Sequence, residues 1–125
     1  MTVKLNHTIV AARDARATAD FLVDVFGFRP AVRADPFLCV ETDNEVTLDV
    51  LATAEEIAPQ HYAFLVSEED FDRIFGRVRD RGLTYWADPF RHRAGEINTN
   101  DGGRGVYFDD PNGHRLEIIT VPYGG

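Results

Sequence analysis

Cysteine, positive charge and long apolar runs are scarce in this sequence, and each scarcity excludes a class of protein. The single cysteine, Cys39, rules out an internal disulfide, and its apolar flank predicts a buried thiol in a reducing compartment. The formal charge of −8 repels nucleic-acid phosphates and anionic membranes, and no dense basic cluster overrides it. No apolar run suits a signal peptide or a membrane span. We therefore expect a cytoplasmic protein without nucleic-acid or membrane partners.

The sequence does contain an internal repeat. Its 125 residues, 44% of them hydrophobic, suffice for a single domain, 1–125. Apolar periodicity predicts a strand, a helix and three strands in each of two copies, about 1–52 and 60–125. The linker between the copies is expected at 53–60. The expected strands and helix of the first copy are 5–11, 15–26, 29–33 and 37–41, followed by a turn and strand within 44–51. Those of the second copy are 62–66, the helix after Ser67, 83–86 and 105–109, followed by a turn and strand within 112–119.

Both predicted helices carry end signals at matching places. Asp14 stands where it can cap the first helix, and Gly27 follows its last apolar residue. Ser67 and Gly82 take the same places around the second helix. Sheets of duplicated units can pair face to face or curve around a cleft, within one chain or across a dimer, and the repeat alone leaves those arrangements open.

Each copy opens on a histidine and closes on an acid: His7 and Asp49 in the first, His61 and Glu117 in the second. Strand alternation turns His61, Asp49 and Glu117 away from their apolar neighbours. Charged groups on central strands are costly to bury unless they are paired or bind a metal. Each residue alone suits a structural role, whereas acid and histidine at both matched positions favour one divalent metal on His7, His61 and Glu117, with Asp49 as a candidate fourth ligand.

The ligand count bears on which metal is bound. Two histidines and one carboxylate with open positions favour iron(II). A second carboxylate, from Asp49, makes the set equally suited to zinc, nickel, cobalt or manganese. The sequence therefore predicts one divalent metal among Fe, Mn, Ni, Co and Zn.

At these residues the sequence resembles the glyoxalase, bleomycin-resistance and extradiol dioxygenase superfamily, also called the vicinal oxygen chelate proteins, over nearly the whole chain. The resemblance implies an α+β fold in which two strand-helix-three-strand modules form a cupped mixed β-sheet around a metal cleft, often completed by a second chain as a homodimer. It also implies that His7, His61 and Glu117 bind the metal. The segments that carry it are Asn6-His7, Asp24-Val25-Phe26-Gly27-Phe28, Gln60-His61-Tyr62-Ala63-Phe64 and Val106-Tyr107-Phe108-Asp109-Asp110-Pro111-Asn112-Gly113-His114-Arg115-Leu116-Glu117.

The superfamily contains several chemistries, and the sequence departs from each. Extradiol dioxygenases place a histidine where this chain has 98–100, Asn-Thr-Asn. Fosfomycin-resistance transferases are similar around His61 and Tyr107, but their phosphonate-binding threonine falls at Ile9 and their basic C-terminal segment has no counterpart. Glyoxalase I carries an acid at the place of Asp49, usually glutamate. Drug-sequestering members lack metal ligands. We therefore expect first a metal-dependent lyase or isomerase of glyoxalase type, with an iron dioxygenase, a fosfomycin-type transferase and a metal-free drug-binding protein as alternatives.

A metal with open positions would chelate a small substrate through two adjacent oxygens and stabilise an oxyanion or enediolate. Asp49 or Glu117 is the expected general base, and Tyr107 the expected hydrogen-bond donor to the developing charge.

One locally basic stretch, 91–93 (Arg-His-Arg) together with Arg104, stands out in this acidic chain. Guanidinium groups suit a substrate carrying carboxylate or phosphate, although surface loops commonly carry arginine for no such reason. The candidate substrate-binding residues are Arg104, Arg91, Trp86 and Phe90.

Overall fold

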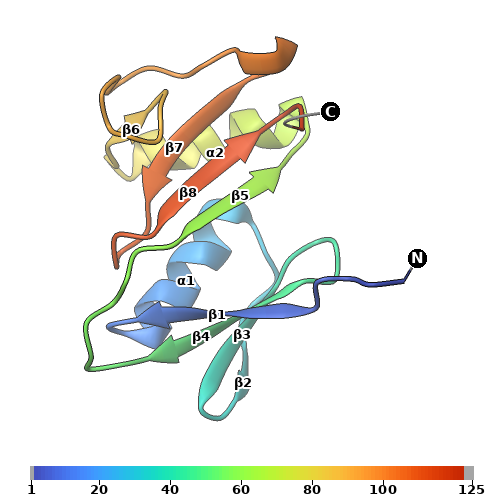
Figure 1. The fold of residues 1–125 in the computed structure, drawn as a ribbon, viewed down its shortest axis with the longest axis vertical. Coiled ribbons are helices and arrows are strands. Elements are labelled where there is room, and N and C mark those ends of the chain that lie inside the picture. Colours follow the sequence, from blue (N-terminus) through green and yellow to red (C-terminus); the bar gives the residue numbers. More distant parts are fainter. Residues whose placement is uncertain (1, 123–125) are drawn as a thin grey trace. The chain divides into compact units, whose positions relative to one another are not determined.

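The computed structural model describes residues 2–122, and the chain divides into two compact units, 1–58 (unit 1) and 59–125 (unit 2). Each unit runs strand, helix, three strands, so the predicted α+β class and module order are confirmed (Figure 1). Unit 1 contains β1 (His7–Ala12), α1 (Ala15–Phe26), β2 (Val32–Ala34), β3 (Phe37–Glu41) and β4 (Thr47–Ala52). Unit 2 contains β5 (His61–Leu65), α2 (Glu68–Asp80), β6 (Tyr85–Trp86), the short 3-10 helix η1 (Asn100–Gly102), β7 (Gly105–Asp109) and β8 (Arg115–Ile119).

α1 begins and ends at the residues that the sequence predicts. The Asp14 carboxylate accepts a hydrogen bond from the Ala17 N–H at 3.0 Å, which satisfies a donor that has no partner inside the helix. Gly27 ends the helix with φ 78°, a left-handed conformation that a residue with a Cβ adopts only with strain. Its N–H donates to the Val23 carbonyl.

α2 has the same kind of ends. The Ser67 side chain accepts from the Asp70 N–H at 3.1 Å. At the other end Gly82 has φ 67°, and the Leu83 N–H donates back to the Val78 carbonyl, as in a Schellman motif. The three acidic residues of the first turn and the basic residues of the last turn also complement the helix dipole.

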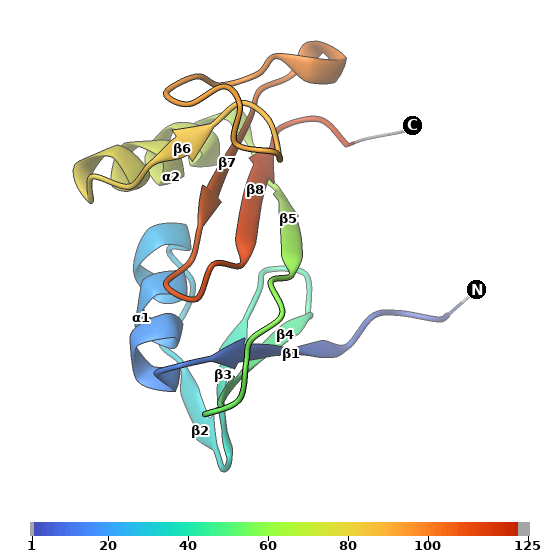
Figure 2. The same ribbon diagram turned by 60° about the vertical axis from the view of Figure 1, so that its left-hand side comes forward.

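Each unit contains one four-stranded mixed sheet, ordered β1-β4-β3-β2 in unit 1 and β5-β8-β7-β6 in unit 2. The first pair in each order is parallel and the others are antiparallel. Because a parallel pair needs a long crossover, each helix lies between the first strand and the rest of its sheet in sequence. One face of each sheet packs on its helix (Figure 2), and side chains from that face form the cores: Val10, Leu38, Val40, Leu48 and Val50 with α1, and Val106, Phe108, Leu116 and Ile118 with α2.

The strand registers of the two units match. His7 lies opposite Thr47 in the β1–β4 pair, and Asp49 follows two residues along β4. In the β5–β8 pair His61 lies opposite Arg115, and Glu117 follows two residues along β8. Asp49 and Glu117 therefore occupy equivalent positions in their sheets, relative to equivalent histidines.

Several strands differ from their predicted bounds, including β5, which spans 61–65 rather than 62–66. β1 begins at His7 rather than at residue 5, and β2 spans only 32–34, the residues that pair with 37–39. β6 is reduced to two residues, because its neighbours leave the sheet for the loop that follows. In the described residues, none of the helices combines the length and the apolar character needed to cross a bilayer.

Candidate metal centre

The sheet face of unit 2 that points away from α2 brings together His61, Glu117 and Tyr107. Glu117 lies opposite Tyr107 in the β7–β8 pair and opposite Ala63 in the β5–β8 pair. The His61 ring stacks on the Tyr107 ring with 6.0 Å between centroids and 26° between planes. The turn that begins at Asp110 delivers β8 back beside β7, as the sequence predicts.

Hydrogen bonding fixes the orientation of the His61 ring. Its Nδ1 lies 3.1 Å from the backbone carbonyl oxygen of Arg115, which only accepts, so Nδ1 carries a proton. Its Nε2 lies 3.1 Å from Oε1 of Glu117. Both atoms offer lone pairs unless a proton lies on Nε2 or on the carboxyl group, so the contact requires either a shared proton or a metal between the two atoms.

Burial makes that requirement stronger. The Glu117 side chain is 0% exposed, whereas the His61 side chain is 48% exposed. A buried carboxylate costs several kcal/mol unless it is paired or coordinated. Imidazole nitrogen and carboxylate oxygen are ligands that zinc, iron, cobalt, nickel and manganese share, so this donor pair fits a divalent transition metal.

The equivalent face of unit 1 holds His7, Asp49 and Cys39. Cys39 lies opposite Asp49 as Tyr107 lies opposite Glu117. Burial raises the pKa of the Cys39 thiol, and its hydrogen bond to the Asp49 carboxylate raises it further. The thiol is partly exposed, not buried as the sequence suggested. His7 is exposed, and its Nδ1 is 2.8 Å from Oδ1 of Asn6.

His7 and Asp49 do not reproduce the His61–Glu117 contact, since in the described part of the chain no hydrogen bond or ion pair joins them. Aspartate is one methylene shorter than glutamate, which accounts for the difference. Within either unit, over the residues described, no group of three or more His, Cys, Asp or Glu side chains is placed to hold a metal. In unit 2, His61 and Glu117 contact each other as a pair.

A charged cluster borders the histidine in unit 2. Asp109 lies opposite Arg115, which lies opposite His61. Asp109 Oδ2 accepts from the Arg91 guanidinium at 2.6 Å, and that guanidinium is 5.4 Å from the centre of the Trp86 ring. Trp86 in turn lies opposite Tyr107. Arg91 and Trp86, two of the predicted substrate-binding residues, are thus near neighbours on or beside the sheet face of the candidate metal centre.

The loop that carries Arg91 is held by Asp88. Its carboxylate accepts from the backbone N–H groups of Phe90, His92 and Arg93. Burial alone would raise the pKa of Asp88, but these three hydrogen bonds outweigh it and lower the pKa. Phe90, another predicted substrate contact, is 73% exposed at the outside of this loop.

Arg104 lies elsewhere in unit 2. Its guanidinium donates to Glu68 at 2.7 Å and to Asp72 at 2.8 Å, and it lies 4.3 Å from the centre of the Phe71 ring. All three partners belong to α2, so this side chain is engaged on the helix side of the sheet. Its predicted contact with substrate stays a prediction.

Asn98, at the place where dioxygenases carry a histidine, has a structural role. It is buried, its amide donates to the Ala87 carbonyl at 2.9 Å, and its backbone pairs with Gly105. These bonds tie the long loop to the start of β7.

Sequence reasoning overlooked one feature that both units share. In unit 1 the Arg29 guanidinium donates to Glu41 at 2.7 Å, and Glu41 lies opposite Thr47, which in turn lies opposite His7. In unit 2 Asp109 has the same position relative to His61, and its carboxylate accepts from the Arg91 guanidinium. A signal was present, because an acid precedes both Asp49 and Glu117 by eight residues.

Comparison with known proteins identifies the family to which this geometry belongs. Residues 4–118 match the family described as Glyoxalase/Bleomycin resistance protein/Dioxygenase superfamily. The chain belongs to this superfamily. The match spans both units, including the strands that hold His7, His61 and Glu117.

Solved structures and a curated relative similar to this superfamily member carry enzyme names. Oxidase ChaP-H2 is 63% identical with a TM-score of 0.97, over 100% of this chain and 98% of its own. Oxidase ChaP-H1 is 57% identical with a TM-score of 0.97, over 99% and 100%. Glutathione transferase FosA of Serratia marcescens is 28% identical over 94% of this chain and 81% of its own length. These names support an enzyme that acts on a small molecule, without fixing its reaction.

Proposed function

We propose that this chain is a metal-dependent oxidase that binds a small substrate through two adjacent oxygen atoms. The observation that carries the proposal is the His61–Glu117 pair, an imidazole nitrogen and a buried carboxylate oxygen 3.1 Å apart, which a divalent metal could bridge in place of a shared proton. Oxidation is supported by the name oxidase of the two structures that are 57% and 63% identical over nearly their full length. It takes precedence here over the lyase or isomerase that the sequence alone favoured.

The proposed ligands are His61 and Glu117 from unit 2 and His7 from unit 1. His7 enters through the repeat, as the equivalent of His61 at the start of its sheet. Two histidines and one carboxylate with open positions are typical of non-haem iron(II) oxygenases, so iron is the first candidate and Mn, Co, Ni and Zn follow. The substrate and dioxygen would need those open positions.

The residues around the ligands have separate tasks. When bound, the metal would stabilise negative charge on the two substrate oxygens and, if it is iron, pass electrons from substrate to dioxygen. The Arg115 carbonyl keeps His61 in the tautomer that presents Nε2. Tyr107, stacked on His61, is proposed to hydrogen-bond the substrate oxygen on which charge develops, and a carboxylate, Glu117 or Asp49, to receive its proton.

A second candidate, a lyase or isomerase of glyoxalase type, is favoured by one observation. Asp49 occupies the position in unit 1 that Glu117 occupies in unit 2, which would allow a four-ligand set. Such an enzyme needs no dioxygen. We propose a homodimer in either case, as the sequence resemblance implies.

Dioxygen uptake separates the two candidates. The full chain, loaded with iron(II), would be mixed with catechol in an oxygen electrode, and with the hemithioacetal of methylglyoxal and glutathione under argon. The oxidase proposal expects uptake with catechol that is lost in Glu117→Gln and retained in Arg16→Ala, an exposed residue of α1 outside the site. Turnover of the hemithioacetal under argon without any dioxygen uptake would instead establish the lyase or isomerase.

A further inference from the structure

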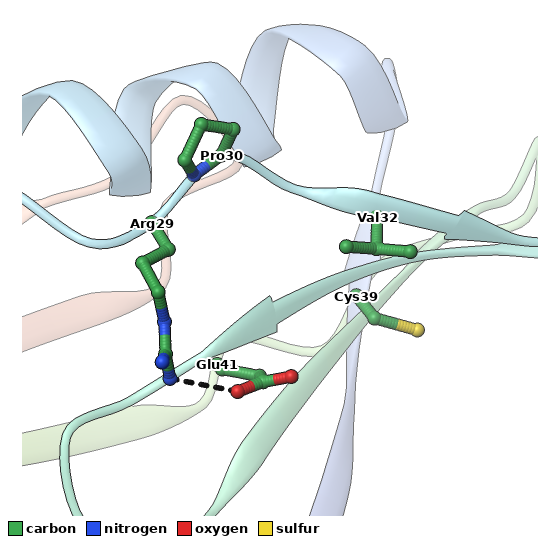
Figure 3. Close-up of a pocket in the computed structure, with 5 residues that line it drawn as sticks. All are labelled: Arg29, Pro30, Val32, Cys39 and Glu41. Carbon is green, nitrogen blue, oxygen red and sulfur yellow. Dashed lines mark hydrogen bonds and ion pairs between the residues drawn. The ribbon is translucent and has the colours of Figure 1, made fainter.

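Unit 1 contains a pocket of about 320 Å³ whose wall includes Cys39, the residue opposite Asp49. It is lined by Arg29, Pro30, Val32, Cys39 and Glu41 (Figure 3). All five of these residues belong to unit 1. Its volume is at the low end for small-molecule sites, enough for a small ligand or one part of a larger one.

The repeat explains why this space is open. Val32 lies opposite Cys39 in the β2–β3 pair, as Trp86 lies opposite Tyr107 in the β6–β7 pair. Unit 2 thus carries two large aromatic side chains where unit 1 carries a valine and a cysteine. The smaller pair leaves unfilled the volume that rings occupy in unit 2.

The polar side of the pocket has no net charge. Arg29 and Glu41 form an ion pair with 2.7 Å between Nη2 and Oε2, drawn as a dashed line in Figure 3. Both side chains are largely exposed, so their pairing is worth at most about 1 kcal/mol and leaves donors and acceptors available. A hydroxyl group suits such a pair, because it accepts from a guanidinium and donates to a carboxylate, whereas a bare anion would be repelled by Glu41.

The Cys39 thiol forms part of the wall beside Val32. A free thiol behaves as a small apolar group. Together with Val32 and Pro30 it provides a surface for an uncharged, apolar group.

We propose that this pocket binds a ring-sized apolar group that carries a hydroxyl, with Val32, Cys39 and Pro30 against the ring and the Arg29–Glu41 pair on the hydroxyl. The inference rests on the proposed function and deepens it by naming a group that the substrate would carry, because Cys39 lies opposite Asp49, a candidate ligand of the metal.

The test is a titration of the full chain with phenol, followed by amide chemical shifts in chelator-treated buffer. We expect saturable shifts at Val32, Cys39 and Glu41 with a Kd of about 1–10 mM, as a fragment of this size allows. Val32→Trp, which installs the side chain found at the equivalent position of unit 2, should weaken binding at least tenfold. Leu65→Trp, an equally exposed strand position in unit 2, is the matched control and should change nothing.

A second comparison tests the hydroxyl and does not depend on a filled pocket. Wild type should bind phenol at least threefold more tightly than toluene, and Arg29→Gln or Glu41→Gln should abolish that preference. Shifts that do not saturate, equal weakening by Val32→Trp and Leu65→Trp, or a preference for phenol that survives in both polar variants would overturn the proposal. Because no metal is present, none of these outcomes depends on the oxidase reaction.

Discussion

Removing His61 should destabilise the metal-free chain, because the buried Glu117 carboxylate would lose its contact with the His61 ring. A hydrogen bond to a charged group contributes about 1.5–3 kcal/mol when both partners are buried. Here Glu117 is 0% exposed but His61 is 48% exposed, so water can replace part of the ring. We therefore expect His61→Ala to lower the free energy of unfolding by about 1–2 kcal/mol, or roughly 4–8 °C in Tm for a chain of this length.

The assay is urea and thermal unfolding in the presence of EDTA, for wild type, His61→Ala, Glu117→Gln and the double variant. Neutralising Glu117 removes the buried charge, so the loss caused by His61→Ala should shrink by about 1 kcal/mol in the Glu117→Gln background. His92→Ala is the control and should stay within about 0.5 kcal/mol of wild type. If His61→Ala costs no more than His92→Ala and the two site variants show no coupling, the His61–Glu117 contact does not exist in solution and the reasoning fails.

Three further outcomes follow from other contacts. Arg104→Ala should lower the free energy of unfolding in urea by about 1 kcal/mol without changing the metal content, since the partners of Arg104 lie on α2. A changed metal content would show that Arg104 acts on the metal site. Gly105→Ala should cost about 1–3 kcal/mol in the same assay, because the added Cβ would come within 2.9 Å of the buried, hydrogen-bonded Asn98 amide. Asp49→Asn should speed alkylation of Cys39 by iodoacetamide at pH 8, followed by mass spectrometry, because losing the carboxylate lowers a raised thiol pKa; an unchanged rate would show that Asp49 does not act on the thiol.

The local signals in the sequence predicted local structure well. Capping residues placed both ends of α1, and the apolar segments expected between helix and final strand match the bounds of β3 and β7. Short edge strands were predicted less well, since β2 and β6 depend on pairing with a neighbour rather than on their own pattern.

For the candidate site, strand parity correctly turned His61, Asp49 and Glu117 away from the apolar faces. Strand parity does not predict which contacts flexible side chains make. The Arg29–Glu41 and Arg91–Asp109 pairs depend on loop conformations that residue spacing does not encode.

The prediction for Arg104 shows the same limit. Its basic neighbours along the chain suggested a substrate contact, but its contacts are set by α2, more than thirty residues away in sequence.

Metal content tests the central claim most directly. The untagged chain would be purified without added metal and measured by elemental analysis beside His7→Ala, His61→Ala, Glu117→Gln and the control His92→Ala. We expect about one divalent metal per chain in wild type and in His92→Ala, and a loss of metal in the three ligand variants. Absence of metal in wild type, even after iron, manganese, nickel, cobalt or zinc is offered, or full metal content in His61→Ala, would contradict it.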